Sequence, residues 1–320
     1  MPGLEKANKY IENRKMIKKA IRKIAHLIGN SITIPDHTNN ETSLLAIGAM
    51  LSKQQYSMNS NNINDYEFKI FSQFGDDGII QYLIKNVEIR NEIFIEFGVE
   101  NYLESNTRFL MMNNNWSGFV MDSSEEAINS LKNQDWYPNF CLTHKAVFID
   151  KDNINALLES AGFSNIGLLH IDIDGNDYHI LKEIDMSRLN PSIIIMEYNS
   201  VFGKDRHITV PYDKNFVRTK SHFSNLYSGA SLPALNYVAT EKGYSLIGCN
   251  LAGNNAYFLR KDLLNEKVKE LSIEKAFKES KFRESRNIDF SFSYLTGNER
   301  LEVIKGLEVL NVKTNQPETL

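Results

Sequence analysis

The chain has 320 residues, of which 42% are hydrophobic and 24% are charged, so it can bury the core of a globular protein. A net charge of −4 carries no signature of nucleic-acid binding, two cysteines exclude a disulfide scaffold, and no apolar run reaches the ~18 residues of a membrane span. The amino end lacks the apolar core of a signal peptide, so we expect a cytoplasmic protein without a transmembrane segment and without a nucleic-acid partner.

Residues 4–28 predict a helix, because isoleucines recur at helical spacing beside a basic flank. Two interpretations of this helix stay open. It attaches to an acidic membrane surface or partner, or it packs on the main domain or on a second subunit in a homo-oligomer. Residues 30–64 are polar and turn-rich around one helical stretch at 44–53. The segment 1–65 is therefore expected to be a helical extension followed by a linker.

Strands and helices alternate from about residue 67 onward. Helices are predicted at 71–87, 105–115, 125–134, 152–162 and 176–186. Strands are predicted at 92–100, 116–124, 139–149, 167–174 and 191–199. Strands separated by helices of this length are typical of a parallel sheet that is covered on both faces.

The pattern changes after the fifth strand. Residues 200–230 show no regular pattern, and irregular stretches of this length in compact domains are usually functional. A helix at 231–243 and two strands within 244–263 follow, and the two strands predict a terminal antiparallel hairpin. A charged helix at 263–285 and a short polar tail complete the predicted elements.

Together these elements predict an α/β fold with a Rossmann-like, mostly parallel seven-stranded sheet. The domain that contains this sheet is expected to span residues 66–262. Residues 263–320 are expected to form a C-terminal helix and tail.

Acidic and polar residues follow nearly every predicted strand. Ligands of open parallel sheets bind at the carboxyl ends of the strands, which makes these residues site candidates. They are, strand by strand, Glu96, Gly98 and Glu100; Asp122 and Ser123; His144 or Asp150; Asp172, Asp174 and Asp177; Glu197 and Asn199. The strands themselves are too apolar to face water, so solvation alone does not explain so many acids.

The first two strands point to a cofactor that contains a nucleoside. Gly98 permits a close approach of the backbone to a ligand, and Asp122 follows 24 residues later, where an acid accepts hydrogen bonds from ribose hydroxyls. EFGVENYLESNT has one glycine where a dinucleotide fingerprint needs three. A cofactor with a ribose and no phosphates fits better, and S-adenosylmethionine is the candidate.

In their order and spacing, FIEFGVENYLESNT, GFVMDSS, LLHIDIDGNDYHIL, PSIIIMEYNS and GYSLIGCNLAGNNAYFLR resemble class I S-adenosylmethionine-dependent methyltransferases, and within them the FkbM-like group. The resemblance covers roughly residues 67–262. It implies that Glu96 and Gly98 face the amino-acid end of the cofactor and that Asp122 faces its ribose. Gln73 and Asp76 before the first strand, and Ser123 and Asp172 at the same rim, are further candidates for cofactor contacts.

Methyl transfer to a hydroxyl needs an aligned acceptor and a route for its proton. One route is a general base, for which Asp177, His179, His207 and His222 are the candidates. The other route is a divalent metal held by Asp174, Glu197 and Asn199, a set that partly resembles metal-dependent sugar methyltransferases. Oxygen ligands favour Mg or Mn, whereas an added histidine such as His170 or His207 favours Mn or Fe. Both routes stay open.

The irregular stretch 200–230 mixes basic and aromatic residues that suit a diphosphate and a sugar or base ring; these are Lys204, Arg206, Tyr212, Arg218 and Tyr227. The expected function is therefore sugar O-methylation, with a carbohydrate or nucleotide-activated sugar for a surface polysaccharide as substrate. Two alternatives remain: a nicotinamide-dependent oxidoreductase, and a non-catalytic scaffold that keeps the methyltransferase fold.

Overall fold

A computed structural model describes residues 37–320. The helix predicted at 4–28 lies outside the described residues. The chain divides into two compact units, Met1–Ala46 and Ile47–Leu320. Both β-sheets and all three clusters of buried apolar side chains lie in the second unit.

The main sheet has seven strands in the order β3-β2-β1-β4-β5-β8-β7. Their bounds are β1 Ile93–Phe97, β2 Ser117–Asp122, β3 Leu142–Ala146, β4 Leu168–Ile171, β5 Ile193–Glu197, β7 Tyr244–Cys249 and β8 Asn255–Arg260. β1 to β5 pair in parallel, and β8 runs antiparallel to both β5 and β7. This topology confirms the predicted Rossmann-like sheet with a terminal antiparallel hairpin.

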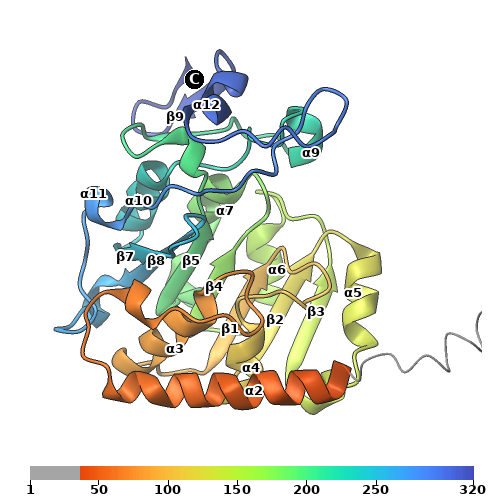
Figure 1. The fold of residues 1–320 in the computed structure, drawn as a ribbon, viewed down its shortest axis with the longest axis vertical. Coiled ribbons are helices and arrows are strands. Elements are labelled where there is room, and N and C mark those ends of the chain that lie inside the picture. The colour runs from red at the N-terminus through yellow and green to blue at the C-terminus, as the bar shows by residue number, and fades with distance from the viewer. Residues whose placement is uncertain (1–36) are drawn as a thin grey trace, which may run out of the picture. The chain divides into compact units, whose positions relative to one another are not determined.

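Helices cover both faces of this sheet (Figure 1). The α-helices are α2 His37–Gln54, α3 Asp76–Asn86, α4 Arg108–Asn114, α5 Glu125–Lys132, α6 Ile154–Ser160, α7 Asp177–Glu183, α8 Met186–Leu189, α9 Arg218–Ser221, α10 Leu232–Glu241, α11 Ile273–Ala276 and α12 Asn298–Ile304. Single 3₁₀ turns lie at Gln55–Ser57, Ile63–Tyr66, Tyr137–Asn139, Ser200–Phe202 and Lys261–Leu263.

The central strands are apolar on both faces because each face is buried against helices. In β1, Ile95 packs with α6, α7 and α10, whereas its neighbour Phe94 packs with α3, α4 and α5. Successive side chains of a strand point to opposite faces, so one unbroken apolar strand supplies both cores. The strands therefore have no face for polar side chains, and the polar residues lie at the strand ends.

The structure differs from the linker predicted before residue 65. α2 is one helix of 18 residues. The 3₁₀ turn Ile63–Tyr66 buries its first and last side chains in the core that contains α3. Gln55 is buried too, and its side-chain amide donates to the carbonyls of Tyr66 and Gly78. Residues 47–66 are therefore part of the folded unit, because Ile63 and Tyr66 are buried in its core although the composition of the segment is polar.

The charged helix predicted at 263–285 is wrong, since only Ile273–Ala276 is helical there. The segment runs along β7 instead, and the amide of Leu271 donates to the carbonyl of Leu246. Val268 and Ala276 of this segment are buried. Tertiary contacts have overridden a high local helix propensity.

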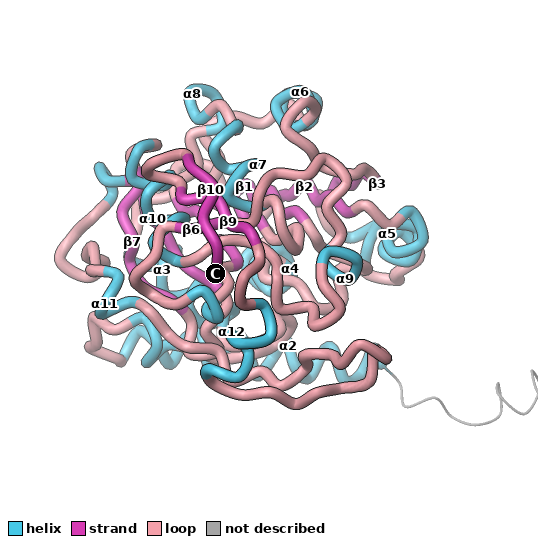
Figure 2. The backbone as a smooth tube through the Cα atoms, turned by 90° about the horizontal axis from the view of Figure 1, so that it is seen from above, coloured by secondary structure: helices cyan, strands magenta, loops and turns pink. Residues whose placement is uncertain are grey.

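A second, three-stranded sheet was not predicted. It has the order β10-β9-β6 and joins β6 Ile208–Thr209, from the irregular stretch, to β9 Glu308–Asn311 and β10 Gln316–Thr319. Figure 2 shows these three strands together above the main sheet. Among residues 37–320, no helix combines the length and the hydropathy that a membrane crossing requires.

Candidate active site

A cavity of about 430 Å³ opens at the carboxyl ends of β1, β2, β4 and β5. This is the edge at which parallel α/β sheets bind ligands, on either side of the point where the strand order reverses. Its acidic lining residues are Glu96, Glu100, Glu104, Asp122, Asp172, Asp174, Glu197 and Glu284. Arg218 is the one lysine or arginine among the described lining residues, so the cavity is strongly acidic.

Glu96 at the end of β1 is buried and saturated with hydrogen bonds. Ser105 Oγ donates to Oε2 over 2.5 Å, and the hydroxyl of Thr107 donates to the same oxygen. The amide of Asn106 donates to Oε1 over 3.1 Å, and His170 Nδ1 lies 2.8 Å from that oxygen. Glu96 thus holds the turn that leads into α4.

The environment of Glu96 favours its ionised form. Burial alone raises the pKa of this carboxyl, but the hydrogen bond and charge of His170, with those of Ser105 and Thr107, lower the pKa below its ordinary value. The side-chain nitrogen of Asn106 lies 3.2 Å from His170 Nε2, and His170 Nδ1 lies against Glu96, so both ring nitrogens have a partner. His170 is therefore engaged in this network and not in a metal site.

Gly98 follows Glu96 with a φ of 73°, a conformation that favours glycine. A Cβ at this position would lie 1.6 Å from the carbonyl oxygen of Asp172, so no other residue fits without a backbone shift. The structure thus explains this glycine by the close contact of its backbone with the end of β4, and the approach of a ligand to Gly98 stays a prediction. Both residues line the cavity.

Asp122 at the end of β2 lies in the cavity wall, as predicted for a ribose-binding acid. Its Oδ2 accepts the amide of Glu100 over 2.8 Å, and its Oδ1 accepts the amide of Ser124 over 2.7 Å. These bonds fix the orientation of the carboxylate and leave each oxygen a further lone pair for a ligand hydroxyl. Ser123 and Gln73 also line the cavity.

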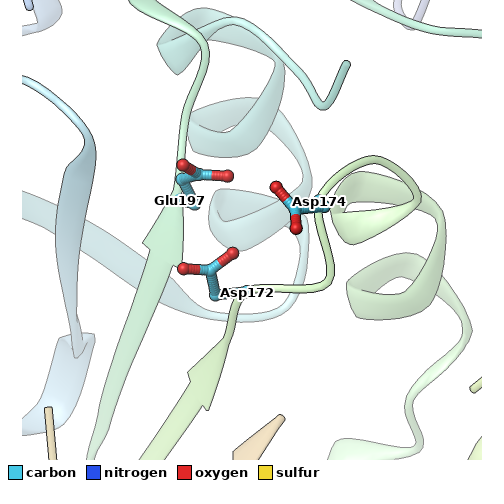
Figure 3. Close-up of side chains that lie close together, drawn as sticks. All are labelled: Asp172, Asp174 and Glu197. Atoms are coloured by element: carbon cyan, nitrogen blue, oxygen red, sulfur yellow. The ribbon is translucent and has the colours of Figure 1, made fainter. Parts of the chain in front are cut away.

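Three further carboxylates converge at the ends of β4 and β5 (Figure 3). Oxygen atoms of Asp172, Asp174 and Glu197 lie within 4.8 Å of one another. Asp174 is held in this position by a loop conformation that is uncommon for a residue with a side chain, with a φ of 59°. The third member of this cluster is Asp172, whereas Asn199 was predicted as the third metal ligand.

The electrostatics of this cluster are opposite to those of Glu96. Among the described residues, no N–H group donates a hydrogen bond to Asp172 or to Glu197. Burial, followed by repulsion from Glu197 and Asp174, raises the pKa of Asp172. Burial also raises the pKa of Glu197, and the charge of Arg218 offsets only part of this rise.

Arg218 is the cation of the site. Its Nη1 donates to Asp174 Oδ1 over 2.7 Å, and its Nε donates to the carbonyl of Asn225. The other two predicted loop cations bind elsewhere: Lys204 pairs with Glu274, and Arg206 pairs with Glu318. The basic cluster predicted for a diphosphate is therefore not assembled at the cavity.

Asn199 is turned away from the acids. Its side-chain amide donates to the carbonyls of Leu226 and Ser228, and its Oδ1 accepts the amide of Val201. All polar atoms of this side chain thus fix the chain after β5. Its predicted role as a metal ligand does not agree with these contacts.

Two of the predicted bases lie inside the fold. Asp177 accepts the amides of Ile173 and Gly175, both over 2.8 Å, and closes the turn before α7. His179 is buried, and its Nε2 donates to the carbonyl of Val210 over 2.9 Å. Burial lowers the pKa of His179 to about 4, so this side chain is neutral, and neither residue lines the cavity.

The two loop histidines do not reach the cavity either. His207 adjoins β6, where its carbonyl accepts the amide of Val312. His222 lies 2.7 Å from the hydroxyl of Ser224 and packs against Phe223. Neither lines the cavity, so the predictions of His207 and His222 as bases lack geometric support.

Several wall residues carried no clear signal in the sequence. Asn176 and Asn255 line the cavity, and the Oδ1 atom of each is buried without a hydrogen-bond partner among residues 37–320. Phe282 and Glu284 enter the wall from the segment that was predicted to be a helix. Asp172 could have been placed in the cluster from sequence, since Asp172 and Asp174 are two residues apart at the end of one strand.

Residues 85–220 match the family model described as the methyltransferase FkbM domain. A search of curated proteins returned no match.

Three solved structures are similar to the chain at low identity. TrmK from M. capricolum, in complex with S-adenosyl-homocysteine, is 13% identical over 60% of this chain and 70% of its own, with a TM-score of 0.34. An O-methyltransferase family protein from Burkholderia thailandensis is 9% identical over 54% and 51%, with a TM-score of 0.35. The S-adenosyl-homocysteine-bound methyltransferase PaMTH1 from Podospora anserina is 12% identical over 77% and 96%, with a TM-score of 0.38. The chain thus spans about half the length of the Burkholderia protein.

The match covers β1 to β5, the Asp122 carboxylate and the acid cluster, and these are the elements on which the resemblance in the sequence rests. This match and the topology of the main sheet support a class I S-adenosylmethionine-dependent methyltransferase, with the similarity to the FkbM domain confined to residues 85–220.

Proposed function

We propose that this methyltransferase is an O-methyltransferase whose acceptor is a hydroxyl group of a carbohydrate. The observation that carries the proposal is the pairing, in one cavity, of Asp122 with the acid cluster Asp172, Asp174 and Glu197. The first suits a cofactor ribose, and the second suits an acceptor rich in hydroxyl groups.

The cofactor side of the cavity follows from the ends of β1 and β2. Asp122 would accept hydrogen bonds from the ribose, and the turn held by Glu96 would lie against the amino-acid end of S-adenosylmethionine. Gly98, Ser123 and Gln73 line the same part of the wall. The methyl group of a cofactor in this position would face the ends of β4 and β5.

On the acceptor side, Asp172 and Glu197 are the groups suited to handle the proton of the hydroxyl. A carboxyl group whose pKa is raised by burial can act as a general base near neutral pH. This role replaces the histidines that were predicted as bases, none of which lines the cavity.

A second version of the proposal places a divalent cation at the acid cluster. The donor set is all oxygen, which suits Mg or Mn better than Fe, and the unpartnered Oδ1 of Asn176 lines the same cavity. A bound cation would orient the acceptor hydroxyl and lower its pKa. Asp172, Asp174 and Glu197 would hold the ion, and Arg218 would have to release Asp174 for it.

A nucleotide-activated sugar is supported less well than an uncharged sugar. The lysine and arginine predicted to bind its diphosphate pair with Glu274 and Glu318, outside the cavity. A diphosphate among eight carboxylates would need a cation to offset the repulsion. The substrate that we propose is therefore a sugar without phosphate, such as a unit of a surface polysaccharide.

Calorimetry with S-adenosylmethionine tests the cofactor side. Asp122→Ala should weaken binding by about 10-fold to 100-fold, since it removes charge-assisted hydrogen bonds to the ribose. The exposed Asp135, which lies outside the cavity wall, provides the matched control Asp135→Ala. Equal affinities of the two variants would contradict the ribose assignment.

Mass spectrometry of reactions with a panel of sugars tests the acceptor side through the gain of one methyl group. EDTA should suppress turnover if a cation participates, and added Mg or Mn should restore it in the wild type but not in Asp174→Ala. Turnover that is indifferent to EDTA would favour the general-base form. Cofactor binding without turnover on any acceptor would favour the non-catalytic scaffold.

A further inference from the structure

The segment between α11 and α12 carries a feature that the methyltransferase reaction does not require. Figure 1 shows this segment, in blue, crossing above the sheet toward α9. A β-bridge joins Arg286 to Phe292, and the amide of Asn287 donates to the carbonyl of Ser291 over 2.9 Å. We call residues 286–294 the aromatic hairpin.

The aromatic hairpin exposes large apolar side chains at every second position. Ile288 is 78% exposed, Phe290 65%, Phe292 44% and Tyr294 55%. Large apolar side chains scattered singly over a surface need no explanation, but four on one short hairpin mark an interaction site.

The rings are held in place. Phe292 and Tyr294 stack with their centroids 5.5 Å apart. The guanidinium of Arg286 lies 3.7 Å from the centre of the Phe292 ring, and that of Arg283 lies 5.3 Å from the centre of the Tyr294 ring. Cation–π contacts of this kind fix the orientation of exposed rings. The hairpin is thus a preformed platform of aromatic rings with planar donors beside them.

This platform continues the wall of the cavity. Phe282 and Glu284, just before the hairpin, line the cavity, and Phe282 stacks on Phe74 with 5.0 Å between centroids. The amide of Arg286 donates to the carbonyl of Ser224, close to the loop that carries Arg218. A molecule bound at the acid cluster would therefore meet the hairpin where it leaves the cavity.

The charge of the cavity limits what this molecule can be. Eight carboxylate residues and one arginine line the cavity, so an anionic polymer or an anionic membrane surface would be repelled at its mouth. Sugar rings present apolar C–H faces that stack on aromatic rings, and their hydroxyl groups accept hydrogen bonds from arginine. The aromatic hairpin therefore suits an uncharged glycan better than a lipid surface.

We propose that the aromatic hairpin is an outer subsite for an uncharged oligosaccharide chain. The sugar to be methylated lies at the acid cluster, and the sugars that follow it stack on Phe290, Phe292 and Tyr294. This inference rests on the proposed function, which it narrows from a carbohydrate to a unit within a glycan chain.

Affinity electrophoresis of the full chain tests the subsite without requiring turnover. The gels contain a neutral polysaccharide (dextran, galactomannan or glucomannan) or the anionic polygalacturonate. Phe290→Ala/Phe292→Ala is compared with Met50→Ala/Tyr56→Ala, which removes side chains that are 71% and 75% exposed on a different element. S-adenosylmethionine affinity, measured in parallel, shows that each variant is folded.

At least one neutral polysaccharide should retard the wild type and the control. The hairpin variant should bind about fivefold or more weakly, as expected for the loss of two stacking rings. No retardation by any neutral polysaccharide, or equal retardation of the two variants, would overturn the subsite. So would flotation of the wild type, but not of the hairpin variant, with phosphatidylglycerol vesicles, since this would make the hairpin a membrane contact.

Turnover separates this inference from the function on which it rests. KM for an oligosaccharide acceptor should rise in the hairpin variant, while KM for the corresponding monosaccharide stays as in the wild type. A wild type that binds glycan but methylates no sugar would refute the proposed function and leave the glycan subsite standing. Unchanged KM for both acceptors would refute the subsite and leave the function standing.

Discussion

Glu96 at the end of β1 and the Asp172–Glu197 pair at the ends of β4 and β5 bring carboxylates to one cavity under opposite conditions. Glu96 receives hydrogen bonds from two hydroxyls, a backbone amide and His170. Asp172 and Glu197 receive none from the N–H groups of the described residues, and burial raises the pKa of both.

The difference separates two uses of a buried acid. A carboxylate whose lone pairs are already satisfied organises the chain and has little left for a ligand. Carboxylates that lack donors are costly to ionise, and they become useful when a proton, a hydroxyl or a cation arrives. Both kinds of carboxylate are buried, so the number of hydrogen-bond donors around each one distinguishes them.

The largest effect is expected at Gly98, where the end of β1 contacts the end of β4. Gly98→Ala places a Cβ 1.6 Å from the Asp172 carbonyl oxygen, whereas Gly162→Ala, at a nearly equal φ of 75°, meets nothing within 4 Å. Both pay the strain of a positive φ, of about 1 kcal/mol. Gly98→Ala should lower the free energy of unfolding by about 3 kcal/mol more than the control, measured in urea. Equal losses would mean that the two strand ends are not in contact.

Replacement of the acid by its amide should have opposite effects on stability at Glu96 and at Asp172. Glu96→Gln puts an amide NH₂ group among buried donors and should destabilise the protein by about 3 kcal/mol. The exposed Glu104, paired with Lys69, gives a control, Glu104→Gln, with an effect of about 0.5 kcal/mol or less. If Glu96→Gln lost no more stability than Glu104→Gln, the hydrogen bonds of Glu96 would not distinguish it from an exposed acid.

Asp172→Asn should instead stabilise the protein by about 1 kcal/mol, measured in EDTA, because folding raises the pKa of Asp172 and so disfavours the ionised form that the unfolded chain carries at neutral pH, a cost that a neutral amide does not bear. Methyl transfer by this variant should nevertheless fall, since the pair is proposed to act on the acceptor hydroxyl. Thermal unfolding and turnover measured on one preparation would show both effects. A variant that is less stable than the wild type would indicate that Asp172 receives donors after all.

Acid should weaken the effect of the Glu96 substitution. The pKa of Glu96 is lowered in the folded state, so its contribution to stability is present above the unfolded pKa and is lost as the pH falls through the folded value. The difference between wild type and Glu96→Gln should therefore shrink by about 1 kcal/mol between pH 7 and pH 4. A difference that grows in acid would reverse the sign assigned to this carboxyl.

Much of this arrangement could be predicted from sequence because it follows from periodicity. The five parallel strands and the terminal hairpin are the runs that were predicted, and the acids at their ends reach one rim. Asp122 and Glu197 were placed correctly at the cavity because strand ends of a parallel sheet converge.

What could not be predicted depends on tertiary contacts. Asn199 and Asp177 have the residue types of a site but spend their hydrogen bonds on nearby backbone groups. Arg218 reaches the cavity only because the irregular stretch folds back over it. Phe282 and Glu284 lie in a segment whose high helix propensity is overridden by its contact with β7, so no local pattern could place them in the wall.

Asp76, at the start of α3, binds residues that follow it by 174 to 181 positions in the sequence. Asn250 and Asn255 donate to its carboxylate, as does the hydroxyl of Tyr257, and all three partners lie on or beside the terminal hairpin. A ribosome that has made residues 85–220 has completed the family domain but not the partners of this buried charge. Native folding of the catalytic sheet must therefore wait until about residue 260 has left the exit tunnel, and a chain interrupted before that point would be a substrate for chaperones and proteases.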